Sequence, residues 1–350
     1  MVAESVDYRA LLVPAIEAVR VHSPTRFSWL GSPSPRLPRR IEESMTAPAA
    51  RRYLRDAVAS RLYTGFYTSG GRLRSEDADR EPMFRDPSFL VALSEANRGS
   101  GPWEAGWSVA RAEDGHVMAT KDGLTLRVPN VACRPGEKGK SLEPGAVVSV
   151  HYPKDLPAMS PGYYLALADR SWVAGDDRAV TRLYWHLTAQ GAVPFVRDLT
   201  ERLNLRKVSF ILKVVDHPSR YSRCDAGILY LARSEYRRVL PDLRAAYSAV
   251  KPYLVDGVPA LTKPIVPGVG FADDPPGDES FGMHRCRLLA EGIVTAHEKK
   301  LRSPQARLES VHVALREAGV DPDRPYLNPG SSFDVRALSI EQESGNRKSG

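Results

Sequence analysis

The sequence predicts an α+β fold in which a mixed, mostly antiparallel sheet is flanked by helices. Three observations support this fold class. Apolar residues follow helical spacing over much of the chain before Trp103, and short extended runs take over after it. The second half of the chain combines strands with helices. It ends in two helical segments that predict a hairpin-like pair.

The N-terminal part begins with apolar residues at helical spacing in residues 7–21, which predicts a helix. Residues 22–40 are rich in Pro, Ser and Arg and predict a loop or linker. A second helix is expected over residues 47–63, where one apolar stripe alternates with arginines. A Gly-Gly pair then interrupts the chain, and a short helix is predicted over residues 87–96.

Short strands are expected in the middle of the chain, where β-branched and aromatic residues alternate with polar ones. The predicted strands cover residues 107–119, 124–128, 146–150 and 163–168. Asp122 and Gly123 form a turn signal between the first two strands. Residues 134–144 are polar and glycine-rich, and we expect this segment to be mobile.

The second half carries the clearest patterns. Strands are predicted over residues 180–187, 208–215, 228–232 and 260–266, and helices over residues 193–203, 234–253, 281–299 and 304–319. The second of these strands is apolar at successive positions, so we expect both of its faces to be buried. Ser234 and Ser280 are predicted N-caps. The last helix has Pro304 at its start and Gly319 at its end, as helices favour.

The length of 350 residues and the apolar fraction of 42% suit one large globular domain or two small ones. We expect a helix and linker in residues 1–46, an α+β domain in residues 47–320 with parts at 47–170 and 171–320, and a flexible tail in residues 321–350. No apolar run approaches the roughly 20 residues of a membrane span. The N-terminus lacks the layout of a signal peptide. The sequence therefore predicts a cytoplasmic protein without a membrane partner.

The net charge of +7 and the pI of about 9.3 favour an anionic partner. No basic arm, zinc finger or RNP motif accompanies this charge, so we expect no nucleic-acid partner. The cysteines Cys133, Cys224 and Cys286 are far apart, and the histidines lack metal-ligand spacing. No P-loop, GxSxG elbow or dinucleotide-binding motif is found. We therefore expect neither a metal site nor an organic cofactor.

Two predicted strands carry polar residues that could act on a phosphate group. Strand alternation places Arg182, Tyr184 and His186 on one face. Lys213 is a lone lysine in an apolar strand, and burial or nearby arginines would lower its pKa, as a general base requires. A solvent-facing strand side and a lysine that reaches solvent at a sheet edge are the alternatives.

Two further segments gather cationic residues. Arg223 and Asp225 could share a face, with the carboxylate orienting a guanidinium that binds phosphate through two hydrogen bonds. Lys263 lies in an extended segment. His284 and Arg285 follow the first turn of a predicted helix, where free N–H groups favour an anion. Surface ion pairs and ordinary helix-surface charge are the alternatives.

Four segments of the sequence resemble the HopA-effector-like family. They are residues 182–188 (RLYWHLT), 210–233 (FILKVVDHPSRYSRCDAGILYLAR), 261–268 (LTKPIVPG) and 279–292 (ESFGMHRCRLLAEG). Weaker similarity lies at residues 62–70 and 93–109, and the whole resemblance covers about residues 54–299. It implies a fold like that of the phosphothreonine lyases.

The resemblance implies two biological settings. Some family members are effectors of plant pathogens, and others are stand-alone lyases of class V lanthipeptide and thioamitide biosynthesis. Those lyases act on a precursor peptide phosphorylated at Ser or Thr by an aminoglycoside-phosphotransferase-like kinase, and they make dehydroalanine or dehydrobutyrine. The chain lacks a secretion signal, so we expect the second setting, with the phosphorylated precursor peptide and that kinase, in a complex, as partners. The alternative function is a non-catalytic phosphopeptide-binding scaffold or effector that partners a kinase.

The resemblance also implies roles for the candidate residues. Lys213 would be the base and His186 the acid, while Tyr184 stands where remoter relatives carry a lysine and could donate to the phosphate or enolate. Lys263 and His284 stay open as the alternative base and acid. The candidate phosphate or substrate ligands are Arg182, Arg223, Asp225, Lys263, His284 and Arg285. Phosphate leaves by C–O cleavage, so no metal is required.

Overall fold

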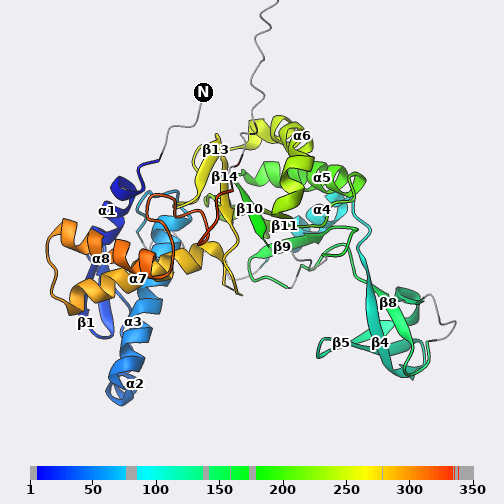
Figure 1. Cartoon of the computed structure of the whole chain (residues 1–350), viewed down its shortest axis with the longest axis horizontal. Helices are drawn as coiled ribbons and strands as arrows, with labels where there is room; N and C mark the ends of the chain where they lie inside the picture. The colour runs from blue at the N-terminus through cyan, green and yellow to red at the C-terminus, as the bar shows by residue number, and fades with distance from the viewer. Residues whose placement is uncertain are drawn as a thin grey trace, which may run out of the picture.

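The computed structural model describes residues 6–75, 85–136, 142–157, 159–172, 179–277 and 279–333, together with 335 and 338. Three antiparallel sheets and the helices packed on them make up this part of the chain (Figure 1). The α+β class with an antiparallel sheet flanked by helices is therefore confirmed. No helix within these ranges is long and apolar enough to cross a bilayer.

The central sheet has six strands. In spatial order they are β13 (Lys263–Val266), β14 (Val269–Asp273), β10 (Val180–Trp185), β12 (Gly227–Ala232), β11 (Phe210–Val215) and β9 (Tyr163–Leu167). Tyr184 of β10 lies opposite Ile228 of β12, which in turn lies opposite Lys213 of β11. Directly paired residues share a face, so these three side chains lie on the same side of the sheet.

One face of the central sheet packs against three helices, α4 (Pro87–Ala96), α5 (Ala189–Leu205) and α6 (Arg233–Val250) (Figure 1). The apolar face of α5 points at the sheet, and Phe195 lies 5.0 Å from Trp185 between ring centroids. This layer forms the larger hydrophobic core and buries Leu183 and Trp185 completely. It fixes which side of β10 faces the site.

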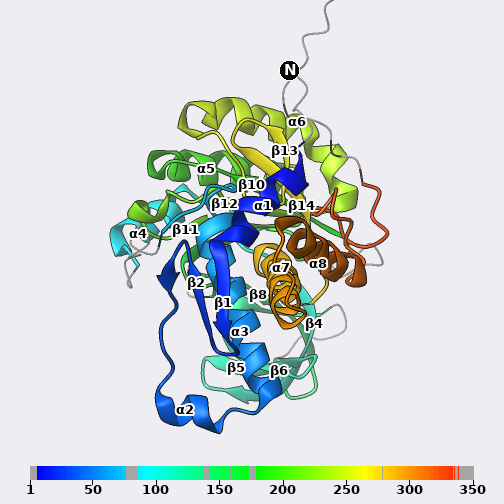
Figure 2. The ribbon, with the colours of Figure 1, turned by 90° about the vertical axis from the view of Figure 1, so that its left-hand side faces the viewer.

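The opposite face of the sheet is covered by a helical lobe of α1 (Tyr8–Ala18), α3 (Ala47–Leu62), α7 (Phe281–Glu298) and α8 (Pro304–Glu317) (Figure 2). A small sheet of β1 (Val19–Ser23), β2 (Arg26–Trp29) and β3 (Ser32–Pro33) belongs to it, and α2 (Arg39–Ser44) follows. A π-helical turn, Tyr63–Tyr67, extends α3 toward the sheet. Gly282 of α7 allows close packing there, because a Cβ atom would lie 2.4 Å from the Tyr67 ring.

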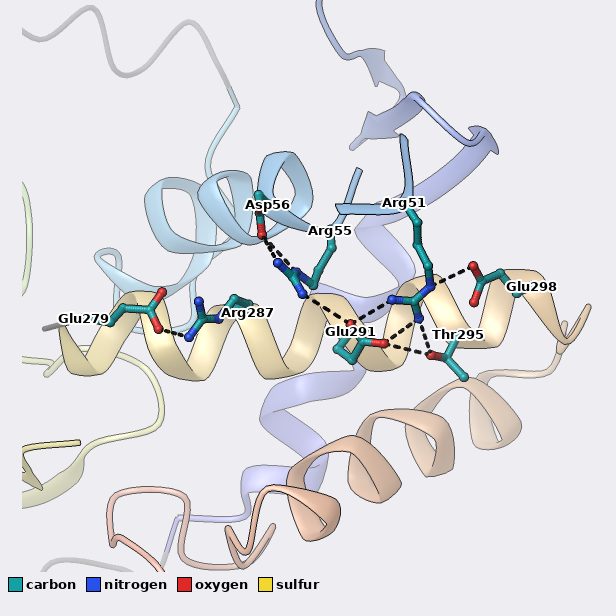
Figure 3. Close-up of polar contacts among 8 residues, drawn as sticks. All are labelled: Arg51, Arg55, Asp56, Glu279, Arg287, Glu291, Thr295 and Glu298. Atoms are coloured by element: carbon teal, nitrogen blue, oxygen red, sulfur yellow. Dashed lines mark hydrogen bonds and ion pairs between the residues drawn. The ribbon is translucent and has the colours of Figure 1, made fainter. Parts of the chain in front are cut away.

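An ion-pair network fastens α3 to α7 (Figure 3). Arg51 of α3 contacts Glu291 at 2.5 Å and Glu298 at 2.9 Å, and it also donates to Thr295. Arg55 approaches Glu291 from the next turn of α3. These side chains are partly exposed, so each pair contributes little alone, and the shared carboxylate makes the network the relevant unit.

A separate five-stranded sheet projects from the rest of the molecule (Figure 1). Its order is β6 (Leu124–Pro129), β5 (His116–Lys121), β4 (Trp103–Glu113), β8 (Val147–His151) and β7 (Cys133–Pro135). It has a small core of its own around Trp107, Val117 and Val148. Neither candidate pocket described below draws a residue from it.

Most predicted helices are confirmed, including the C-terminal pair α7 and α8. Ser280 and Ser303 cap them by accepting the N–H of Met283 and Ala306. The N-cap prediction for Ser234 is wrong, because β12 leads directly into α6 and Ala232 holds the cap position.

Three other expectations need correction. Residues 22–40 are not only a linker, since β2, β3 and part of β1 lie there. The predicted strand 107–119 is two strands that turn at Asp114 and Gly115, and β14 was missed. Part of the polar segment 134–144, at residues 137–141, and most of the tail beyond residue 333 lie outside the described residues.

Candidate functional site

Two pockets open on the face of the central sheet that the helical lobe covers. The first, here called the Lys213 pocket, has a volume of about 410 Å³ and is lined by Lys213, Arg182, Tyr230, Asp274, Glu279 and Ser280, among others. The second, here called the His186 pocket, has a volume of about 290 Å³ and is lined by His186, Arg72, Arg74, Ser222, Cys224 and Gly257, among others. The two pockets have no lining residue in common.

Lys213 is half-buried at the floor of its pocket. Its Nζ lies 5.4 Å from the ring centroid of Tyr230 and donates to the Ser160 hydroxyl at 3.5 Å. Burial lowers the pKa of the Lys213 ammonium, the positive charge of Arg182 lowers it further, and Asp274 opposes them. A lysine in this environment loses its proton at a lower pH than an exposed lysine, as a general base requires.

Arg182 lines the same pocket as Lys213 and is only 6% exposed. Its guanidinium lies 4.9 Å from the Tyr230 ring centroid and forms an ion pair with Asp274. Burial raises the pKa of the Asp274 carboxyl, although Arg182 counteracts this. Glu279, the other acid of the pocket, is held by Arg287 (Figure 3). The pocket therefore contains two basic side chains, Lys213 and Arg182, and the Asp274 carboxylate contacts the second of them.

His186 follows the end of β10 and is 8% exposed. Its Nδ1 lies 3.2 Å and 3.3 Å from the carbonyl oxygens of Asp256 and Gly257. A carbonyl only accepts, so this nitrogen carries a proton, and Nε2 is the ring nitrogen that a ligand in the pocket can reach. Burial lowers the pKa of His186, which makes the free ring neutral near pH 7.

Two arginines give the His186 pocket its positive charge. Arg72 and Arg74 belong to the segment after the π-helical turn, and Arg74 donates to the Ser222 hydroxyl at 3.4 Å. Burial raises the pKa of the neighbouring Cys224 thiol to about 12, so it is not a thiolate. With two guanidinium groups, hydroxyls and a neutral imidazole, this pocket suits a phosphate or carboxylate.

A buried polar cluster lies between the two pockets. Arg223 donates to Asp225 through Nε at 2.5 Å and through Nη2 at 3.1 Å, and Asp225 also accepts from Tyr63 and Tyr163. The predicted pairing of Arg223 with Asp225 on one face is therefore present. Arg223 lines neither pocket, and Asp225 occupies the Nε and Nη2 edge of its guanidinium.

Tyr184 is fully buried between the pockets, against Phe281 of α7. Its hydroxyl lies close to that of Tyr67, and neither oxygen completes a well-aligned hydrogen bond with a described residue. Burial raises the pKa of the Tyr184 phenol, which Arg182 partly offsets. Tyr184 is thus on the predicted face, but covered by the helical lobe.

Three of the predicted residues line neither pocket and lie outside the cluster between them: Lys263, Arg285 and His284. Lys263 pairs with Phe271, which pairs with Leu183, so it lies on the opposite face of the sheet from Lys213. Arg285 is completely buried and donates to the carbonyls of Pro325 and Leu327, which anchors the C-terminal segment on α7.

His284 accepts from Arg285 at 2.6 Å through Nδ1. Burial and the adjacent arginine lower the pKa of His284 to about 4. A histidine with this pKa has no proton to give near pH 7, so the geometry does not favour it as the acid. It fits a structural role beside Arg285.

Several pocket residues were not predicted as site residues, among them Arg72, Arg74, Asp274 and Tyr230. Arg72 and Arg74 lie in a loop more than a hundred residues before His186, and no local period marks them. Asp274 directly follows β14, the strand that the sequence did not indicate. Tyr230 could have been found, because it alternates with Ile228 in a strand that was predicted. Within the described ranges no group of three His, Cys, Asp or Glu could hold a metal ion.

Comparison with known proteins identifies one family. The model of the HopA1 effector protein family matches residues 154–327, which include both pockets' sheet residues. The effector protein from Pseudomonas syringae pv. tomato strain DC3000 is 17% identical over 83% of this chain and 94% of its own, with a TM-score of 0.44. The one from pv. syringae strain 61 is 14% identical over 93% and 98%, with a TM-score of 0.44. No curated protein matches the chain.

Proposed function

We propose that this chain, a member of the HopA1 effector protein family through residues 154–327, is a lyase that eliminates phosphate from phosphoserine or phosphothreonine in a peptide. The observation that carries the proposal is the Lys213 pocket. It combines a half-buried lysine of lowered pKa with a neighbouring arginine that a carboxylate already orients. A base and an anion ligand on one sheet face are the minimum that this reaction needs.

Lys213 acts as the base. Its neutral amine takes the α-proton of the phosphorylated residue, the electron pair forms the Cα–Cβ double bond, and the bond from Cβ to the phosphate oxygen breaks. The product is dehydroalanine from phosphoserine or dehydrobutyrine from phosphothreonine. A well-positioned base typically contributes about 10²- to 10⁴-fold in rate.

Arg182 binds the phosphate, and Asp274 holds the guanidinium in place until the substrate arrives. Oδ1 of Asp274 contacts both Nε and Nη2 of the guanidinium and stands in for a phosphate oxygen, and a phosphate dianion carries more charge to compete for the same donors. Burial already raises the pKa of Asp274, so the carboxyl gives up Arg182 more readily than an exposed aspartate would.

The leaving phosphate needs a proton, because a dianionic ester would otherwise release a trianion. The ammonium formed on Lys213 lies in the same pocket and can return the proton that it took from Cα. His186 is the acid that the sequence suggested. Its free ring is neutral near pH 7, so it serves this role only for a substrate that spans both pockets and whose phosphate charge raises the pKa of His186. Loss of His186 therefore distinguishes a proton donor from a residue that binds another part of the substrate.

We further propose that the substrate is a ribosomal precursor peptide, phosphorylated by an aminoglycoside-phosphotransferase-like kinase that associates with this chain. This assignment comes from the family resemblance of the four quoted segments. The positive charge of +7 supports it, because a basic protein attracts a phosphorylated and acidic peptide.

A second candidate function is a phosphopeptide-binding scaffold without turnover. The separation of His186 and Lys213 into different pockets favours it, because the His186 pocket with Arg72 and Arg74 can hold an anion without a base nearby. A scaffold needs the arginines alone. An enzyme needs Lys213 as well.

The test is incubation of the purified chain with a synthetic phosphothreonine peptide, followed by mass spectrometry. The lyase is supported if the peptide loses phosphoric acid, if Lys213→Ala abolishes this loss and if Lys299→Ala leaves it unchanged. Lys299 is the control because it is exposed and lines neither pocket. Tight binding with an intact phosphopeptide supports the scaffold. Elimination that survives Lys213→Ala would contradict the assignment of the base.

A further inference from the structure

A third groove lies at the far end of the helical lobe, between β1 and the turn that joins α7 to α8. We call it the β1 groove. It has a volume of about 480 Å³, and Val19, Val21, Ile293 and Leu301 form its apolar part. β1 is the edge strand of the three-stranded sheet, because β2 is its one partner among the residues that the structure describes. The groove therefore runs along an open sheet edge.

The register of β1 against β2 shows which backbone groups face the groove. Val21 lies opposite Phe27, and the Phe27 carbonyl accepts from Ser34 on the other side of β2. In an antiparallel pair, the backbone groups of opposite residues point in opposite directions when the pair is not hydrogen-bonded. The N–H and C=O of Val21 consequently point away from β2, toward the groove.

Cationic side chains surround this edge. Arg20, His297 and Arg302 line the groove and are exposed, and Glu17 is the single acid among its lining residues. Arg307 lies deeper and donates to the Val19 carbonyl at 2.7 Å, which satisfies that backbone group and leaves Val21 as the open position. Arg20 and Arg302 form no ion pair with any residue in the described ranges.

We propose that the β1 groove binds an acidic, extended peptide segment, which pairs with β1 as an added strand of the small sheet. Outward backbone groups at Val21 provide the hydrogen bonds, the apolar wall accepts alternate side chains, and the arginines select for carboxylates. Nucleic acid also carries negative charge, but it has no backbone that pairs with a strand edge. A peptide is the occupant that uses both features.

The proposed role of the β1 groove rests on the proposed function in one respect, the origin of the peptide. That peptide would be the non-reacting part of the phosphorylated substrate. Helix α7 connects the two sites, since its N-cap Ser280 lines the Lys213 pocket while Ile293 and His297 line the β1 groove. At 1.5 Å per residue this separation is about 20–25 Å. An extended peptide of roughly 3.3 Å per residue covers it with about six to eight residues. The acidic segment should therefore lie at least that far from the phosphorylated residue.

The test uses a fluorescein-labelled peptide of alternating Val and Glu, titrated with the full chain and followed by fluorescence anisotropy. Arg20→Glu/Arg302→Glu should weaken binding by about tenfold or more, because two attractive pairs become repulsive. The matched control is Arg36→Glu/Arg40→Glu, which makes the same charge change at two exposed arginines outside the groove. Val21→Pro removes one outward N–H at an edge, where proline is tolerated, and should weaken binding about threefold to tenfold.

Three results would overturn the proposal. The peptide does not bind, both double variants weaken it equally, or an oligothymidylate of equal charge binds the groove as tightly as the peptide does. Elimination from a short phosphopeptide that cannot reach the groove is measured in parallel. It should be unchanged in Arg20→Glu/Arg302→Glu, so failure of the groove and failure of the lyase are read separately.

Discussion

The buried pair of Arg223 and Asp225 allows a quantitative test of how the site is held. The substitution Asp225→Asn keeps the size of the side chain and removes its charge. Arg223 is 8% exposed and Asp225 1%, so the guanidinium would remain buried without a counter-charge. Breaking a buried ion pair on one side costs about 3–5 kcal/mol, and we expect that loss in the free energy of unfolding. For a chain of 350 residues it corresponds to a fall in Tm of roughly 4–7 °C.

The assay is urea unfolding followed by tryptophan fluorescence, with Glu235→Gln as the matched control. Glu235 contacts Arg238 at 2.5 Å, the same distance as in the buried pair, but the two side chains are 24% and 47% exposed. The control should cost less than about 1 kcal/mol. Equal costs for the two amide substitutions would refute the argument that burial makes the difference.

A double variant separates loss of attraction from the cost of an unpaired charge. Arg223→Met/Asp225→Asn removes both charges, and the coupling between the two substitutions should recover much of the single-variant loss. If Arg223→Met restores nothing in the Asp225→Asn background, the destabilisation comes from the hydrogen bonds that Asp225 accepts from Tyr63 and Tyr163.

Three further predictions concern the site and its packing. The rate of elimination should rise with pH as Lys213 loses its proton. Asp274→Asn should move this rise to lower pH, because Asp274 raises the pKa of Lys213. A pH–rate profile of each protein measures the shift. Gly282→Ala should destabilise the chain by about 1–3 kcal/mol in thermal unfolding, since the new Cβ would lie 2.4 Å from the Tyr67 ring. His284→Gln should leave the pH–rate profile unchanged, because a histidine with a pKa of about 4 stays neutral across the working range; a lost limb of the profile would contradict this.

The sequence correctly predicted helices and strands whose own residues show a clear capping signal or apolar pattern. The α7 helix was found because Ser280 caps an apolar-periodic segment, and β11 because its residues are apolar at successive positions. β2 was missed because Pro, Ser and Arg dominate the composition around it. Its stability comes from tertiary packing, in which Phe27 and Trp29 are buried in the core of the helical lobe.

The site shows the same division between local and non-local information. Alternation along β10 correctly placed Arg182 and Tyr184 on one face, and it could not tell which positions on that face would be covered. Phe281 and Tyr67 decide this, and they come from segments about a hundred residues away on either side. Arg72 and Arg74 reach the His186 pocket in the same non-local way.

The covered stretch between the pockets is the point on which the catalytic assignment depends. Tyr67 and Phe281 close the sheet face over Tyr184, and the hydroxyls of Tyr67 and Tyr184 are buried without a well-aligned partner. We predict that, if substrate binding displaces the π-helical turn, the two pockets join and His186 comes close to the leaving group. If the pockets join, His186→Ala should lower kcat. If the closure over Tyr184 persists with substrate bound, His186→Ala should raise KM alone.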